Sequence, residues 1–68
     1  MIGPYLIGIV ECFDVRVGLG TIRTTEGEPI PFHCLSIADG TRDIPTGADV
    51  VFRVIRRFGR DEAVGITR

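Results

Sequence analysis

The sequence predicts an all-β fold in which five short antiparallel strands form a closed or nearly closed barrel. Val, Ile, Thr and Phe gather in short runs, which is typical of strands. Glycine-containing turns separate these runs, and no long stretch has apolar residues at helical spacing. Closure is expected because it removes the exposed edges of a small sheet.

The apolar runs give the five strands directly. They are assigned to Leu6–Asp14, Gly18–Thr24, Ile30–Cys34, Val50–Ile55 and Glu62–Thr67. The fourth run shows the clearest alternation, with Val50, Phe52 and Val54 on one face. Strand alternation then predicts a core made of Val10, Ile22, Ile30, Phe32, Val50, Phe52, Val54 and Ile66.

Turn signals occupy the connections between these strands. Gly27 is expected to adopt a positive φ in the hairpin turn Thr25–Glu28. Leu35–Ile37 is long enough for a single helical turn. The remaining turns are expected at Asp14–Val17, at Asp39–Gly40 and Pro45–Gly47, which bracket a loop, and at Arg56–Arg60.

Length and composition limit the functional classes. A chain of 68 residues with 44% hydrophobic residues and a net charge of −1 is expected to form one small globular domain, residues 1–68. The longest apolar run is too short to cross a membrane, and no secretory signal is visible, so a cytoplasmic protein is expected. Cys12 and Cys34 are expected to be free thiols. No metal site, cofactor or catalytic constellation is expected, and the protein is not expected to be an enzyme.

Several segments follow one another in an order that resembles a known family. They are Gly8-Ile9-Val10-Glu11-Cys12-Phe13-Asp14, Val17-Gly18-Leu19-Gly20-Thr21-Ile22, Ile30-Pro31-Phe32-His33-Cys34 with Leu35-Ser36-Ile37, Asp39-Gly40, Thr46-Gly47 and Val50-Val51-Phe52. In this order and spacing the chain resembles the bacterial cold-shock domain from residue 8 to about residue 66. The resemblance implies an oligonucleotide/oligosaccharide-binding (OB) barrel that binds single-stranded DNA or RNA.

Most of the aromatic residues on which that family stacks bases are absent. Leu19, Thr21, Pro31 and Cys34 stand at phenylalanine positions of the family, Cys12 at its tryptophan, Thr41 at its loop aromatic, and Glu11 and Val17 at basic positions. Each stacked base contributes about 1–3 kcal/mol. Tight binding of the family type is therefore not expected, and Glu11 is expected to repel phosphate.

What remains of the binding face lies on the outer side of the second and third strands. Alternation places Leu19 and Thr21 outward on the second strand, and Pro31 and His33 outward on the third. His33 either stacks a base or is a surface imidazole with no partner. Phe13 either stacks a base or covers the end of the barrel. Pro31 lacks an N–H, so its strand is expected at a sheet edge or a bulge.

A second candidate is the arginine turn between the fourth and fifth strands. Arg53, Arg56, Arg57 and Arg60 surround Phe58 at its tip. A phenylalanine flanked by arginines can stack one base and neutralise phosphates. The same turn can dock an acidic protein surface or be a solvated turn.

Two functional hypotheses follow. The first is a weak single-stranded nucleic-acid-binding protein that uses Phe13, Leu19, Thr21, Pro31, His33, Arg56, Arg57, Phe58 and Arg60. The alternative is an OB barrel that docks a protein partner, or a second copy in a homodimer. Its surface would be an apolar patch made of Leu19, Thr21, Pro31, Cys12 and Cys34.

Overall fold

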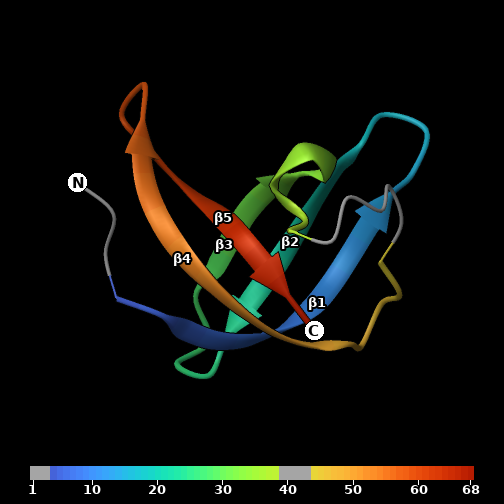
Figure 1. Cartoon of the computed structure of the whole chain (residues 1–68), viewed down its shortest axis with the longest axis horizontal. Helices are drawn as coiled ribbons and strands as arrows, with labels where there is room; N and C mark the ends of the chain where they lie inside the picture. Colours follow the sequence, from blue (N-terminus) through green and yellow to red (C-terminus); the bar gives the residue numbers. More distant parts are fainter. Residues whose placement is uncertain (1–3, 39–43) are drawn as a thin grey trace.

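The chain forms five β-strands and one short 3₁₀ turn in a computed structural model that describes residues 4–38 and 44–68. In chain order the elements are β1 (Leu6–Asp14), β2 (Leu19–Thr24), β3 (Pro29–His33), η1 (Cys34–Ser36), β4 (Asp49–Arg57) and β5 (Arg60–Thr67) (Figure 1). The all-β prediction is therefore confirmed. Among the described residues, no helix is long and apolar enough to cross a membrane.

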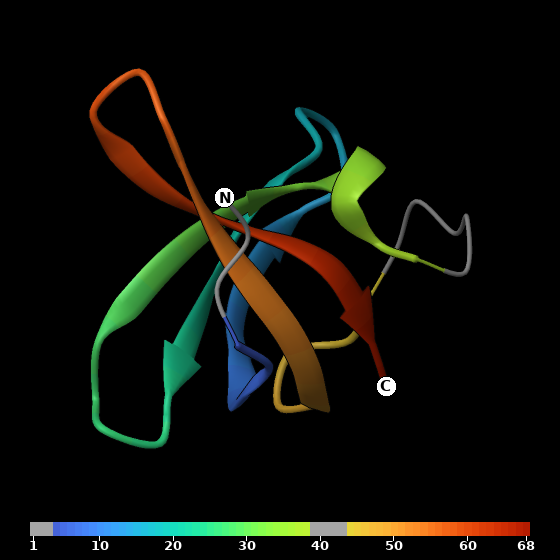
Figure 2. The same cartoon turned by 60° about the vertical axis from the view of Figure 1, so that its left-hand side comes forward.

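All five strands belong to one antiparallel sheet with the order β3-β2-β1-β4-β5. The sheet curves strongly, so that β5 passes in front of β3 and β2 in both views (Figures 1 and 2). It is not closed, because within residues 4–38 and 44–68 no ladder joins its two edges, β3 and β5. A single parallel bridge between Ile37 and Ile66 links the edges beyond η1, where the Ala38 amide donates to the Ile66 carbonyl at 2.8 Å.

The core fills the inside of this curved sheet. Seven of the eight predicted core residues are buried, and Val54 is half-buried against them. The core also contains four residues that strand alternation did not identify, Cys34, Ile37, Ile44 and Ala63. Three of these four lie outside the strands, on the segments that cover the open end of the sheet.

A β-bulge in β1 changes which side chains face inward. Val10 pairs with Ile22 while Cys12 pairs with Thr21, so Glu11 is the extra residue. Val10 is buried, whereas Glu11 and Cys12 are both exposed and Phe13 turns back toward the core. Bulges commonly redirect side chains in this way.

The strand boundaries differ from the prediction mainly around the fourth strand. β4 continues through Arg56 and Arg57, so the predicted five-residue turn shrinks to two residues, Phe58 and Gly59. β3 and η1 each begin one residue earlier than expected, and β2 begins at Leu19. Gly27 has the expected positive φ, 90°. The predicted Asp39–Gly40 turn and Thr41 lie outside the described residues.

Candidate nucleic-acid interface

An open groove of about 1080 Å³ lies between the outer face of β2 and β3 and the β4–β5 hairpin. One side is formed by residues of β2, β3 and η1, and the other by the hairpin and the start of β5. The two regions that sequence reasoning treated separately therefore face the same space.

Seven of the nine predicted binding residues line this groove. They are Leu19, Thr21, Pro31, His33, Arg57, Phe58 and Arg60. Phe13 and Arg56 do not line it.

Phe13 is placed by the bulge of β1 as a cover for the core. Its ring is half-buried and stacks on that of Phe32, with the centroids 5.6 Å apart and the ring planes 6° from parallel. Gly20 lies on β2 between these two residues, because its Cα partners are Phe13 on β1 and Phe32 on β3. A Cβ on Gly20 would lie 2.6 Å from Cζ of Phe32, so only glycine leaves room for the Phe32 ring. This geometry favours the covering role that was one of the two alternatives for Phe13.

His33 has a structural partner. Its Nδ1 accepts a hydrogen bond from the Leu35 amide at 3.1 Å and caps η1. In the neutral ring this leaves Nε2 as the N–H donor. The half-buried imidazole therefore orients η1, and the alternative of a histidine with no partner is wrong.

An apolar shelf forms the β2–β3 side of the groove. Leu19 is 54% exposed and Leu35, on η1, is 85% exposed. Pro31 is exposed on β3, which is an edge strand as its missing N–H required. Leu35 was missed because the sequence placed it in a helical turn without showing which way its side chain points.

The two cysteines occupy different environments and are both free. Cys12 is exposed and lines the groove, whereas Cys34 is 5% exposed and belongs to the core. Cys34 therefore does not belong to the predicted apolar surface patch. The position is buried because the chain turns inward from β3 into η1 at this residue.

Phe58 stands at the tip of the hairpin in an unusual conformation. The turn has φ of 53° at Phe58 and 76° at Gly59, as in the two-residue turns that favour Asn-Gly. A bulky residue with a positive φ is an outlier that costs about 1–3 kcal/mol. The Phe58 side chain is nevertheless 97% exposed, so burial does not compensate for this cost. Strain of this kind gathers at functional sites.

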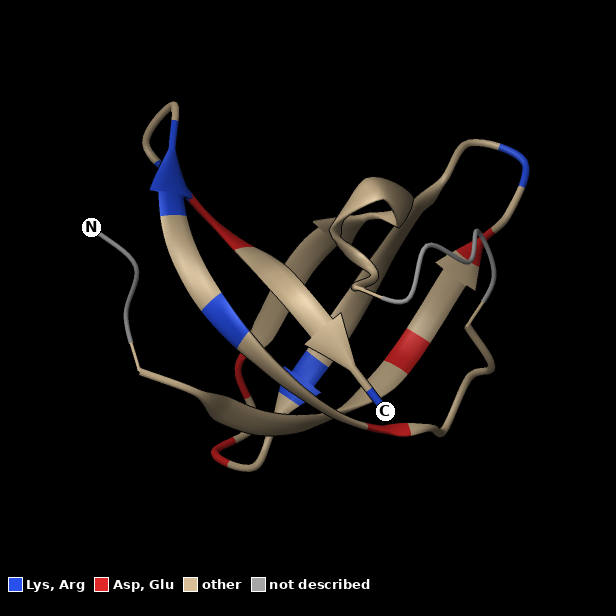
Figure 3. Cartoon of the chain, in the orientation of Figure 1, with Lys and Arg blue, Asp and Glu red and all other residues tan. Residues whose placement is uncertain are grey.

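Charged groups of both signs surround the hairpin (Figure 3). Arg56 pairs with Asp61, and Arg57 with Glu62, each at 3.6 Å between nitrogen and oxygen. Asp61 and Glu62 also line the groove, which sequence reasoning did not expect. Their carboxylates partly offset the positive charge of the hairpin, and Arg60 adds a cation to the groove wall.

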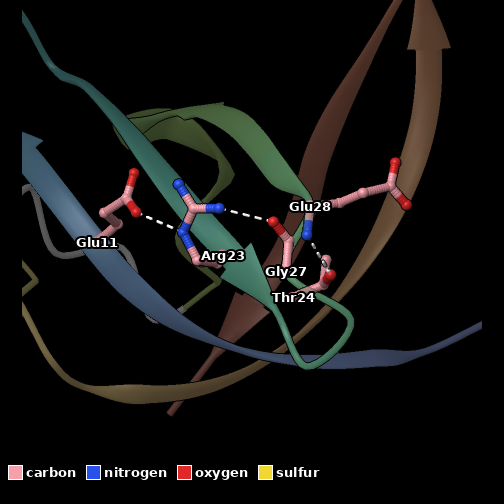
Figure 4. Close-up of polar contacts among 5 residues, drawn as sticks. All are labelled: Glu11, Arg23, Thr24, Gly27 and Glu28. Carbon is pink, nitrogen blue, oxygen red and sulfur yellow. Dashed lines mark hydrogen bonds and ion pairs between the residues drawn. The ribbon is translucent and has the colours of Figure 1, made fainter.

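Glu11, expected to repel phosphate, is held by an arginine on the neighbouring strand. Arg23 donates a hydrogen bond from Nε to the Glu11 carboxylate, and from Nη1 to the Gly27 carbonyl at 2.6 Å (Figure 4). This hydrogen bond lowers the pKa of the Glu11 carboxyl below its ordinary value and raises the pKa of Arg23. The charge of Glu11 is thus compensated locally, and the repulsion it exerts on phosphate is reduced.

Comparison with known proteins gives no family assignment. No protein-family model matches the chain, and no curated protein matches it significantly.

Proposed function

We propose that this chain is an OB-fold protein similar to the cold-shock domain that binds single-stranded DNA or RNA weakly in the groove beneath the β4–β5 hairpin. The observation that carries the proposal is the strained, fully exposed Phe58 between Arg57 and Arg60. An aromatic ring beside two guanidinium groups suits a base and its flanking phosphates. The cytoplasm of a bacterial cell is the proposed location.

The expected affinity is low. One exposed ring contributes about 1–3 kcal/mol through stacking, and the shelf of Leu19, Leu35 and Pro31 adds apolar contact without aromatic stacking. Arg56 and Arg57 already pair with carboxylates of the protein, which weakens their attraction for phosphate. A dissociation constant of roughly 10–1000 µM corresponds to about 4–7 kcal/mol, which this set of contacts supports.

A second candidate is supported by the apolar groove residues. Leu19, Leu35 and Phe58 together expose large apolar surface around one groove. Exposed apolar patches with a polar rim often mark protein docking sites. On this alternative an apolar peptide occupies the groove, and Phe58 acts as an anchor residue without contacting a base.

A fluorescence anisotropy titration separates the two candidates. A labelled pyrimidine-rich single-stranded oligonucleotide is titrated with protein at several salt concentrations. We expect saturable binding in low salt whose affinity falls as salt rises, because arginine–phosphate contacts release counterions. Absence of binding at several hundred micromolar protein in low salt would remove the nucleic-acid proposal.

Matched variants then locate the site. Arg60→Gln should weaken binding and reduce its salt dependence, because one phosphate contact is lost. Arg16→Gln is the control, because Arg16 is an exposed arginine that does not line the groove. Equal effects of the two substitutions would mean that binding depends on overall charge and would rule out a specific site in the groove.

A further inference from the structure

The outer face of β1 and β4 carries a second apolar surface that shares no residue with the groove. Tyr5 is 66% exposed, Ile7 61%, Ile9 49% and Val51 37%. We call these four residues the outer patch. Ile7 and Val51 are Cα partners at its centre, and Ile9 pairs with Asp49 at one end.

From Leu6 to Val10, β1 is apolar on both faces, and β4 places Val51 outward beside Ile7. Their inward residues, among them Val10, Val50 and Phe52, are buried in the core. A strand with one face in water normally alternates apolar and polar residues, whereas apolar residues on both faces are typical of strands covered on both sides. The sequence pattern of β1 therefore suits a strand whose outer face is covered, and Val51 of β4 extends the apolar surface beside Ile7.

The charges around the outer patch are arranged so that the patch complements itself. The outward row of β4 reads Asp49, Val51, Arg53, with an acid at one end and a base at the other. At the basic end, the Arg53 guanidinium lies 4.6 Å from the centroid of the Tyr5 ring. When two such faces pack about a two-fold axis that runs across the strands, each β4 lies antiparallel to the other. Asp49 then faces Arg53 of the second copy, and the central Ile7 and Val51 side chains meet.

We infer that this outer face is a homodimer interface in which a second copy of the chain covers the outer patch. The net charge of −1 gives little long-range repulsion between copies. A standard stable interface buries about 800 Å² per partner, and four apolar side chains provide only part of this area. The expected dimer is therefore weak, with a dissociation constant of about 10–500 µM, and it leaves both grooves open.

Charge reversal provides the sharpest test, because a self-complementary pair can be converted into a hetero-pair. Asp49→Arg places two bases opposite each other in the dimer, and Arg53→Asp places two acids opposite each other. Each variant alone should dimerise about tenfold more weakly than the wild type or worse. An equimolar mixture of the two should recover dimers, because every facing pair is again opposite in charge. Sedimentation equilibrium from about 10 µM to about 1 mM covers the expected range, and circular dichroism checks that each variant is folded.

Apolar substitutions give an independent readout. Ile7→Ser should weaken dimerisation about tenfold, because it removes the side chain at the centre of the interface. Leu35→Ser is the matched control in the groove and should leave the dimer unchanged. A wild-type protein that remains monomeric at about 1 mM would overturn the inference. So would a mixture of charge variants that stays monomeric, or a dimer lost with Leu35→Ser and kept with Ile7→Ser.

Discussion

At the level of single residues, Phe58 combines a strained backbone conformation with an exposed aromatic ring. Its φ of 53° lies in a region that bulky residues avoid, and its ring is almost fully exposed. Stability alone would favour asparagine or glycine at this position of a two-residue hairpin turn. Under the proposed function, the aromatic side chain at this position serves to contact a base.

Phe58→Asn should consequently make the protein more stable and less able to bind. Relief of the strained conformation is expected to raise the free energy of unfolding by about 1 kcal/mol. Loss of the ring should weaken oligonucleotide binding by about 1–3 kcal/mol. Urea denaturation and anisotropy measure the two effects, and Phe58→Tyr, which keeps the ring, serves as the control. A variant that is less stable than the wild type would contradict the strain argument.

Gly20 is required for close packing between β1 and β3. A methyl group at this position would lie 2.6 Å from the Phe32 ring and 2.7 Å from the Cys12 carbonyl oxygen. Gly20→Ala should lower the free energy of unfolding by about 1–3 kcal/mol, because the Phe32 ring must move. Thr21→Ala, at the neighbouring position, should change it by much less. Similar urea midpoints for wild type and Gly20→Ala would show that the ring moves without cost.

The sequence predicted outward residues well where the strands alternate regularly. Leu19, Thr21, Pro31 and His33 lie on the face that alternation assigned to them. The direction of the Phe13 side chain was not predictable, because the extra residue in β1 reverses the alternation beyond Glu11. The conformation of Phe58 was also not predictable, because phenylalanine does not signal a positive φ.

At the scale of the elements, hydrogen bonds of the Arg23 side chain connect the β2–β3 hairpin to β1. This arginine bonds both the Glu11 carboxylate and the Gly27 carbonyl (Figure 4). The Thr24 hydroxyl accepts a hydrogen bond from the Glu28 amide at 3.1 Å and closes the same turn. The hairpin that carries part of the groove is thereby held in register with β1.

The hydrogen bond between Arg23 and Glu11 makes the free energy of unfolding depend on pH. The hydrogen bond from Arg23 lowers the pKa of Glu11 in the folded state. The folded protein thus holds the Glu11 proton less tightly than the unfolded chain does. The stabilisation is fully present above the pKa that Glu11 has in the unfolded chain, and it is lost as the pH falls through the lowered pKa of the folded state.

Glu11→Gln provides the comparison for this prediction. The variant should be less stable than the wild type at pH 7, and the difference should shrink as the pH is lowered below about 4. Thermal unfolding at a series of pH values measures it. Glu26→Gln is the control, because Glu26 is an exposed glutamate in the turn between β2 and β3. A difference that stays constant with pH would contradict the pairing of Glu11 with Arg23.

At the scale of the whole molecule, the open side of the sheet is sealed by segments outside the strands. Ile37 bridges to Ile66 and is 4% exposed, and Ile44 is 2% exposed. Alternation identified most core residues of the strands and missed these two, because irregular segments have no periodicity to reveal which side chains point inward. The five strands were predictable to within two residues at each end, whereas the incomplete closure was not, because it depends on how the edges meet.

Ile37→Ala tests the importance of this seal. Truncation of a buried isoleucine costs about 2–5 kcal/mol, which is a large share of the stability of a domain this small. Leu35→Ala, two residues earlier and 85% exposed, should be nearly neutral. Equilibrium urea unfolding compares the two variants, and equal losses would show that the segment after β3 does not seal the core.

The central claim is that single-stranded nucleic acid occupies the groove between the β4–β5 hairpin and the β2–β3 face. Amide chemical shifts of ¹⁵N-labelled protein, followed during titration with a pyrimidine-rich oligonucleotide, test it most directly. The account predicts progressive shifts that concentrate at Arg57, Phe58, Arg60 and Leu19, with little change at Ile7 and Ile9, which do not line the groove. Shifts confined to the outer face of β1 and β4, or no shifts at millimolar oligonucleotide, would contradict it.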